Sequence, residues 1–261
     1  MIKLEKGSYD EIYRLYLTNE FFFPLIAAVL LDEQDGVVYV NDLTAPSQAY
    51  VEHAFGFAQV FGGTVESFEQ ELERYLLVDK CFNPSKIRLY APYLPEFLAL
   101  PKHESLRSYR QRFTISAEGF SYGPRISYEP EKNVHLCGID ATNISLVDNK
   151  FGVVRRFWRG PSDFIQSSNA VVVFYEGEPA SICYSAAEAD HRVEIDVLTL
   201  PAYRKLGLAR VAVVAFVNRC LGLTLRPLWD CFTNNPGSMN LCKSVGFVAS
   251  KAPYPFFTIN R

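Results

Sequence analysis

The chain has 261 residues and a formal net charge of −3, which argues against a protein that holds nucleic acid by bulk electrostatics. Its six cysteines show no C-x-x-C pair and no metal-ligand spacing, so we expect reduced thiols and no metal site. The apolar run at residues 21–31 is too short to span a membrane, and no secretory signal opens the sequence. A cytoplasmic protein is therefore expected.

The first 130 residues predict a mixed α/β domain. Residues 6–17 predict a helix with Ser8 as its N-cap, and residues 21–31 predict a buried helix or strand. The other elements expected in this part are a helix at residues 67–77 and strands at residues 36–42, 54–61, 87–90 and 112–115. We expect two domains, formed by residues 1–130 and 131–261.

Basic residues cluster after this first domain, at Arg155, Arg156 and Arg159 around Trp158. No further basic run accompanies them, so a nucleic-acid patch is not favoured. We interpret the cluster as a helix end or an interdomain contact.

The C-terminal part alternates predicted strands and helices. Two apolar runs flank Glu176-Gly177-Glu178, which predicts a β-hairpin. A strand is expected at residues 192–200, a helix at 211–221 and another strand at 227–233. Asn235 then caps a predicted helix, with Pro236 at its first position and Gly246 just past its end.

The segment Arg204-x-x-Gly207-x-Ala209 joins the strand at 192–200 to the following helix. A glycine turn before a helix N-terminus brings unpaired N–H groups together where the helix dipole favours negative charge. We therefore expect a ligand that carries phosphates, although a solvated turn remains the alternative. The segment matches neither a P-loop nor a Rossmann fingerprint.

A second motif follows at a fixed distance, with Asn235, Ser238, Leu241, Gly246 and Phe247 in register. Together the two motifs resemble Arg/Gln-x-x-Gly-x-Gly/Ala and Asn-x-x-Ala/Ser-x-x-Leu-Tyr-x-x-x-Gly-Phe of the GNAT superfamily of acyl-CoA N-acetyltransferases. The resemblance runs from about residue 169 to the C-terminus. Residues 36–42, 156–159 and 227–231 also resemble a bacterial two-domain GNAT group, which includes antibiotic self-resistance acetyltransferases of the zwittermicin type.

The resemblance implies an α/β fold with a mixed sheet, in which a C-terminal GNAT fold follows an N-terminal α/β domain. The N-terminal order of elements, which ends in Gly119-Phe120, resembles a degenerate copy of the same fold. This copy has no Arg-x-x-Gly-x-Gly/Ala motif, so we do not expect it to bind CoA.

The resemblance also implies a set of acetyl-CoA contacts. The strand at 192–200 would diverge from the next strand and offer backbone groups to the pantetheine amides, while the turn would bind the pyrophosphate. The implied cofactor-binding residues are Val197, Leu198, Thr199, Arg204, Lys205, Leu206, Gly207, Leu208, Ala209, Asn235 and Ser238.

Transfer of acetyl to an amine requires a base that removes a proton near neutral pH. Glu194 and Asp196 alternate on the predicted strand, so both carboxylates face one side and could raise each other's pKa. The resemblance implies a Glu base at about the place of Glu194. Asp196 is the next candidate, followed by Glu188, Asp190 or His191 in the preceding turn. Cys242 stands where many GNAT enzymes have a Tyr that protonates the departing CoA thiolate. A thiol can donate a proton to a thiolate, so Cys242 stays a candidate acid. We interpret it instead as a small buried helix residue and expect the acid to be another group, such as Tyr254 or Tyr203, or water.

The expected function is transfer of acetyl from acetyl-CoA to a primary amine of a small molecule, by direct attack in a ternary complex. The alternative is a non-catalytic acyl-CoA sensor or interaction module. We expect the N-terminal half to shape the acceptor pocket or to form a subunit interface, the latter giving a homodimer. Nucleic acid and membrane partners are not expected.

Overall fold

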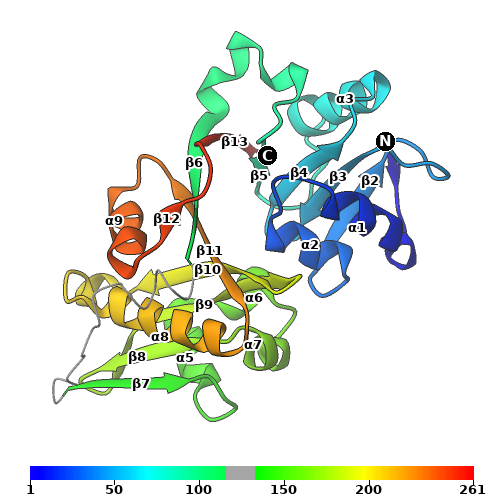
Figure 1. Cartoon of the computed structure of the whole chain (residues 1–261). Helices are drawn as coiled ribbons and strands as arrows, with labels where there is room; N and C mark the ends of the chain where they lie inside the picture. Colours follow the sequence, from blue (N-terminus) through cyan, green and yellow to red (C-terminus); the bar gives the residue numbers. More distant parts are fainter. Residues whose placement is uncertain (116–132) are drawn as a thin grey trace. The chain divides into compact units, whose positions relative to one another are not determined.

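The computed structural model describes residues 1–115 and 133–261. They form two compact units (Figure 1): unit 1 comprises Met1–Arg110 and Pro253–Arg261, and unit 2 comprises Gln111–Ala252. The domain boundary expected at residue 130 and the expected end of the N-terminal copy at Gly119-Phe120 lie outside the described residues.

Unit 1 is built on a mixed sheet that the C-terminal strand completes. Its strands lie in the order β1-β2-β3-β4-β5-β13-β6. They are β1 (Ile2–Lys3), β2 (Gly36–Val40), β3 (Gln48–His53), β4 (Phe57–Gly62), β5 (Lys86–Tyr90), β13 (Tyr254–Asn260) and the first half of β6 (Arg107–Thr114). β4 and β5 are parallel, and the other neighbouring pairs are antiparallel.

The helices of unit 1 are α1 (Asp10–Leu17), α2 (Pro24–Leu30) and α3 (Glu66–Glu73), and α3 continues as a π-helical turn, η2 (Arg74–Val78). Short 3-10 turns are η1 (Lys6–Ser8), η3 (Glu96–Leu98) and η4 (Pro101–Leu106). The expected helix at 67–77 is confirmed, and its Phe68, Leu72 and Leu76 share one core with Phe257 of β13.

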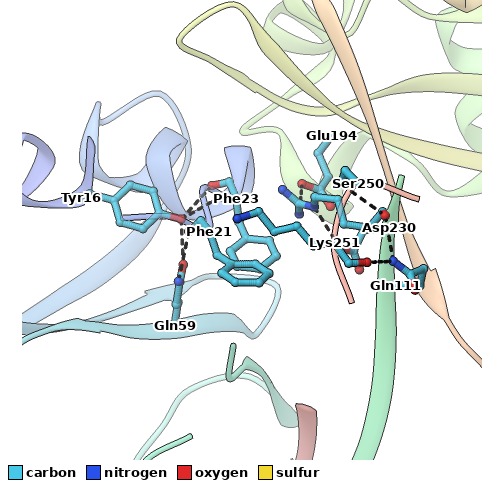
Figure 2. A network of polar contacts seen from close by, with 10 residues as sticks. Tyr16, Phe21, Phe23, Gln59, Gln111, Glu194, Asp230, Ser250 and Lys251 are labelled. Atoms are coloured by element: carbon cyan, nitrogen blue, oxygen red, sulfur yellow. Dashed lines mark hydrogen bonds and ion pairs between the residues drawn. The ribbon is translucent and has the colours of Figure 1, made fainter. Parts of the chain in front are cut away.

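Hydrogen bonds tie α1 and α2 to β4. The Tyr16 hydroxyl donates to Gln59 Oε1 at 2.7 Å and accepts from the Phe23 N–H at 2.7 Å (Figure 2). Pro24 occupies the first turn of α2, where a missing N–H costs nothing, and every residue of α2 is buried. The central part of the apolar run at 21–31 is therefore a buried helix, Pro24–Leu30.

Two local predictions for unit 1 were wrong. Ser8 does not cap the first helix, because it ends η1 and α1 begins at Asp10 after Tyr9. The strand expected at 54–61 begins only at Phe57. Gly56 has φ +88° there, and a Cβ would come 2.2 Å from the Lys86 carbonyl oxygen, so the chain makes a tight turn before β4.

Unit 2 repeats this plan. Its strands lie in the order β7-β8-β9-β10-β11-β6, and β12 pairs with β6. They are β7 (Val134–Gly138), β8 (Val171–Tyr175), β9 (Glu178–Ala189), β10 (Arg192–Thr199), β11 (Arg226–Phe232), the second half of β6, and β12 (Val248–Ala249). β10 and β11 are parallel, and β7 to β10 are antiparallel.

The helices of unit 2 are α5 (Ile144–Phe151), α6 (Val154–Phe157), α7 (Pro161–Ser167), α8 (Leu208–Gly222) and α9 (Pro236–Val245), with a 3-10 turn, η5 (Pro201–Tyr203). Helix α8 packs Val213, Phe216 and Val217 into one core with Val193 of β10 and Trp229 of β11. The predicted hairpin is present, with Tyr175 opposite Glu178 and positive φ at Glu176 and Gly177.

The two units share one order of elements. Each has a first strand, then helices, three antiparallel strands, a long helix segment and a strand parallel to the one before it. These steps run from β1 to β5 in unit 1 and from β7 to β11 in unit 2 (Figure 1). The N-terminal part is thus a second copy of the arrangement in unit 2. Within residues 1–115 and 133–261, none of the helices has the length and apolarity that a bilayer crossing requires.

Because β13 completes the sheet of unit 1, replacing Phe257 with Ala should destabilise that unit. Phe257 is fully buried, and loss of such a ring costs about 3–5 kcal/mol. Urea unfolding of Phe257→Ala should show this loss. Asn260→Ala, at an exposed position of the same strand, is the control and should unfold like the unaltered protein. Equal stability of Phe257→Ala and Asn260→Ala would show that β13 does not hold unit 1 together.

Candidate active site

β10 and β11 pair over only three residues and then diverge. Arg192, Val193 and Glu194 are in register with residues 226–228 of β11, whereas β10 stays paired with β9 as far as Thr199. β11 itself continues to Phe232, so both strands run on after they separate. Among the described residues, the edge of residues 195–199 that points away from β9 is therefore not paired with β11. This is the divergence that the sequence resemblance implied.

The turn after β10 leads directly into the first amides of α8. Lys205 has φ +66° and Gly207 has φ +76°, so the chain bends twice in the left-handed region before Leu208. A Cβ at Gly207 would meet no atom within 4 Å, so backbone conformation alone favours glycine at this position. The first N–H groups of α8 have no intrahelical acceptor.

Positive charge accompanies these amides. Arg204 and Lys205 are exposed in the turn, and Arg204 Nε donates to the Thr199 carbonyl oxygen at 3.4 Å. This hydrogen bond links the turn to the end of β10. Two cations and a helix N-terminus at one place make a site that suits an anion such as a pyrophosphate.

The second motif forms the start of α9, as predicted. Asn235 Oδ1 accepts a hydrogen bond from the Ser238 N–H at 3.1 Å, Pro236 occupies the first turn, and Gly246 ends the helix with φ +106°. The Ser238 hydroxyl accepts from Trp229 Nε1 at 3.0 Å, which ties α9 to β11. Since the Asn235 oxygen caps the helix, Asn235 would contact a ligand through its amide nitrogen.

Glu194 lies where the two strands separate, and it is buried in a cluster of charges. Arg112 Nη2 of β6 lies 3.6 Å from Glu194 Oε2, and Arg112 Nε donates to Asp230 Oδ2 of β11 at 3.2 Å. Glu194 and Asp230 are both labelled in Figure 2. Arg112 and Asp230 were not recognised as site residues from the sequence. The available signal for Asp230 was a single charged residue inside an otherwise apolar run of β11, whereas β6 is rich in polar residues and gave no such signal for Arg112.

Asp196 shares a face of β10 with Glu194 but has different partners. Val193, Ile195 and Val197 pack toward the core under α8, so the two carboxylates point to the opposite face. Asp196 Oδ2 accepts from the Tyr184 hydroxyl at 2.5 Å and lies 3.0 Å from Arg156 Nη1. Burial, followed by the charge of Asp196, raises the pKa of Tyr184, which keeps its hydroxyl protonated as a donor. Each carboxylate therefore has an arginine beside it.

The basic cluster at residues 155–159 is in part a helix end, because Arg155 and Arg156 lie in the last turn of α6. Its Arg156 makes the ion pair with Asp196 that is described above.

Cys242 and Tyr254, two of the three side-chain acid candidates, lie in packed surroundings, and the third, Tyr203, is partly buried with its ring 5.9 Å from that of Tyr175. Cys242 is fully buried, its thiol donates to the Met239 carbonyl oxygen at 3.2 Å, and burial raises its pKa to about 12. A thiol held so firmly protonated is a poor proton donor. Tyr254 belongs to unit 1, where its ring lies 5.6 Å from that of Phe21 and 5.7 Å from that of Phe23. These surroundings favour packing roles for both residues.

A family model for GNAT acetyltransferases matches residues 17–257. The chain belongs to the GNAT acetyltransferase family. It is 32% identical over 262 aligned residues to YdfB, an uncharacterized N-acetyltransferase of Bacillus subtilis (strain 168), and the alignment covers 94% of each chain. Membership of this family identifies the protein as an acyl-CoA-dependent acetyltransferase.

Solved structures agree on the fold. A GCN5-related N-acetyltransferase-like protein of Streptococcus suis 89/1591 is similar over 98% of this chain and 99% of its own, with a TM-score of 0.73 at 18% identity. A tandem GNAT protein from the clavulanic acid biosynthesis pathway is similar over 99% and 97%, with a TM-score of 0.63 at 10% identity. The expected mixed α/β GNAT fold is confirmed, and the tandem relative agrees with the repeated order of elements.

The two GNAT copies differ in charge where a phosphate would bind. In unit 2, Arg204 and Lys205 precede α8. In unit 1, the first turn of α3 carries Glu66 and Glu69, and these residues line a surface pocket with Glu73 and Glu96. Carboxylates at a helix N-terminus occupy the favourable dipole position themselves and repel a phosphate. The charges therefore favour unit 2 as the copy that binds CoA.

The cap at Asn235 holds the start of α9, so Asn235→Ala should lower stability by about 1 kcal/mol through loss of the bond to the Ser238 N–H. Chemical denaturation measures this change. Asn235→Asp keeps an acceptor oxygen at the cap and should retain most of the stability. If Asn235→Ala and Asn235→Asp were equally stable, the cap would contribute nothing.

Proposed function

We propose that the protein transfers acetyl from acetyl-CoA to a primary amine of a small molecule, by direct attack in a ternary complex. The observation that carries this proposal is the divergence of β10 from β11, which in this proposal opens a slot for the pantetheine arm. It has an anion site at the start of α8 on one side and the Glu194 carboxylate at the point of separation.

In this proposal the donor binds mainly through backbone groups. Residues 197–199 pair with the two pantetheine amides along the open edge of β10, and the N–H groups of residues 206–209 bind the pyrophosphate. Arg204 and Lys205 contribute positive charge, and the amide nitrogen of Asn235 and the small Ser238 flank the pantetheine arm. The members of this set are Val197, Leu198, Thr199, Arg204, Lys205, Leu206, Gly207, Leu208, Ala209, Asn235 and Ser238.

The acceptor enters as an ammonium ion and must lose a proton before it can attack. Glu194 takes this proton through a water molecule, because its own side chain is buried. The neutral nitrogen then forms a bond to the acetyl carbonyl carbon, the carbon–sulfur bond breaks, and the departing CoA thiolate takes a proton. The products are the N-acetyl amide, CoA thiol and one proton released to solvent.

The remaining groups around β10 serve the acceptor in this proposal. Asp196 lies on the same face as Glu194 and is partly exposed, so its carboxylate attracts an ammonium group toward the base. Since Cys242 is buried with a raised pKa, we assign protonation of the thiolate to water rather than to this thiol.

Replacing Gly207 with Glu should abolish acetyl-CoA binding, because a carboxylate would enter the anion site. Titration calorimetry with acetyl-CoA measures the affinity directly. Gly152→Glu is a matched control: Gly152 also has a positive φ, its Cβ would also meet nothing within 4 Å, and it ends α5. An affinity that falls in neither variant, or equally in both, would contradict the assignment of the turn.

Replacing Glu194 with Gln should lower kcat by about 10²–10⁴-fold and leave the acetyl-CoA affinity unchanged, because the amide cannot accept the proton. Thiol release measured across polyamines, amino acids, aminoglycosides and peptide N-termini first identifies an acceptor for the unaltered enzyme. Undiminished turnover by Glu194→Gln would exclude Glu194 as the base. Tight acetyl-CoA binding without turnover of any amine would instead favour a non-catalytic acyl-CoA sensor.

A further inference from the structure

We propose that Arg210 recognises the 3′-phosphate of acetyl-CoA, the phosphate monoester that the adenosine ribose carries in addition to the pyrophosphate. The inference rests on the proposed function, because it requires acetyl-CoA to bind at the turn before α8. Arg210 directly follows the first sequence motif, which ends at Ala209, so the motif itself gives it no role. With this residue the enzyme would distinguish acetyl-CoA from its dephosphorylated form.

Positive charge at the start of α8 is not confined to the turn. Within the described part of the chain, basic residues that form no ion pair with a carboxylate stand in the turn, in the first turn of α8 and in the last turn of α9: Arg204, Lys205, Arg210 and Lys243. A phosphate monoester adds about 1.5 to 2 negative charges near neutral pH to those of the pyrophosphate. The cations beyond the turn therefore suit a ligand that carries both groups.

The position of Arg210 on its helix favours an anion beside it. Arg210 is the third residue of α8, in the turn where the helix dipole is positive, so its own charge opposes the dipole. Arg219, in the last turn of the same helix, is placed favourably by the same rule. The first turn of α8 has no acidic residue to balance Arg210. A bound phosphate would balance the arginine and the helix end together.

Hydrogen bonds to α9 fix the guanidinium of Arg210 and leave donors for a ligand. Arg210 Nε and Nη2 donate to the Ser244 carbonyl oxygen at 3.3 and 3.2 Å. The Ser244 hydroxyl donates to the Leu241 carbonyl oxygen at 2.8 Å, which holds this end of α9 in place. The hydrogens on Nη1 and the second hydrogen on Nη2 have no acceptor among the described residues. A planar fork that is already fixed, with donors to spare, suits a phosphate group.

The covalent structure of the donor keeps its monoester close to the pyrophosphate. The 3′-phosphate is attached to the ribose whose 5′ oxygen carries the pyrophosphate, so the two groups are one sugar ring apart. Arg210 is three residues after Gly207, which is about 4.5 Å along the helix axis. Its long side chain can therefore reach a group one ring beyond a pyrophosphate in the turn. Lys243, which precedes Ser244 and is exposed, adds a second positive charge at this end of α9.

Two donors that differ only in this phosphate test the inference. Titration calorimetry should give acetyl-CoA a higher affinity than acetyl-3′-dephospho-CoA, and Arg210→Gln should reduce this preference by about tenfold or more. Arg204→Gln should weaken the binding of both donors by a similar factor, since both contain the pyrophosphate. Arg219→Gln is the matched control: it removes the same charge from the exposed last turn of the same helix and should leave both affinities unchanged.

A second readout follows the ligand itself. In 31P NMR of bound acetyl-CoA, the 3′-phosphate should titrate at lower pH than in the free molecule, because a neighbouring cation favours the dianion. This downward shift should be lost in Arg210→Gln and kept in Arg219→Gln. If loss of the bonds to Ser244 prevents Arg210→Gln from folding, Arg210→Lys, which keeps the charge but not the planar fork, should still lower the preference for acetyl-CoA.

Equal weakening of both donors by Arg210→Gln would overturn the inference, because it would assign Arg210 to the pyrophosphate or to the packing of α9. Equal affinity of the unaltered enzyme for the two donors would overturn it as well. Both outcomes leave the proposed function standing, since that function requires only that acetyl-CoA binds at the turn. If instead Gly207→Glu leaves the affinity for acetyl-CoA unchanged, the proposed function is contradicted, and this inference with it.

Discussion

The separation of β10 from β11 after Glu194 is the constraint on which the rest of the site depends. Backbone polar groups in a sheet normally find partners in the next strand, and within residues 1–115 and 133–261 the residues 195–199 pair with β9 and not with β11. The register between β9 and β10 also shifts between Glu194 and Ile195, where β9 has one extra residue, Ala186, and such a bulge increases the local twist. The pairing of β10 with β11 ends at the same place, at the residue that supplies the proposed base. A ligand with two amides can then replace the missing neighbour.

A buried charge cluster occupies the point of separation. Arg112, Glu194 and Asp230 join β6, β10 and β11 where the sheet of unit 2 begins to open. Removing one member of a buried ion pair costs about 3–5 kcal/mol, because the other charge then stays buried without compensation. Apolar side chains of similar volume would hold the three strands together without the possibility of leaving a buried charge uncompensated. Under the proposed function, these three ionisable groups stand here because the reaction uses a carboxylate at this point of the strand.

Sequence reasoning succeeded where the determining signals were local. The glycine turn at Gly207, the Asn235 cap and the periodic apolar face of α3 each depend on residues within one or two turns of chain, and all are present. It failed for β3, where Gln48, Glu52 and His53 are buried polar residues that hide the strand pattern. The bond between Arg112 and Asp230 spans 118 positions, so its formation depends on sheet topology that no local pattern encodes.

The two copies of the fold differ in charge at the start of the helix that follows their third antiparallel strand: Glu66 and Glu69 begin α3, whereas Arg204 and Lys205 precede α8. We therefore expect only unit 2 to bind acetyl-CoA. Residue-resolved hydrogen exchange with and without acetyl-CoA tests this most directly. The account predicts slower exchange at residues 195–199 and 206–209 when acetyl-CoA is added. Exchange should stay unchanged at residues 62–66, which lead into the first residue of α3. Protection at residues 62–66, or none at residues 195–209, would contradict it.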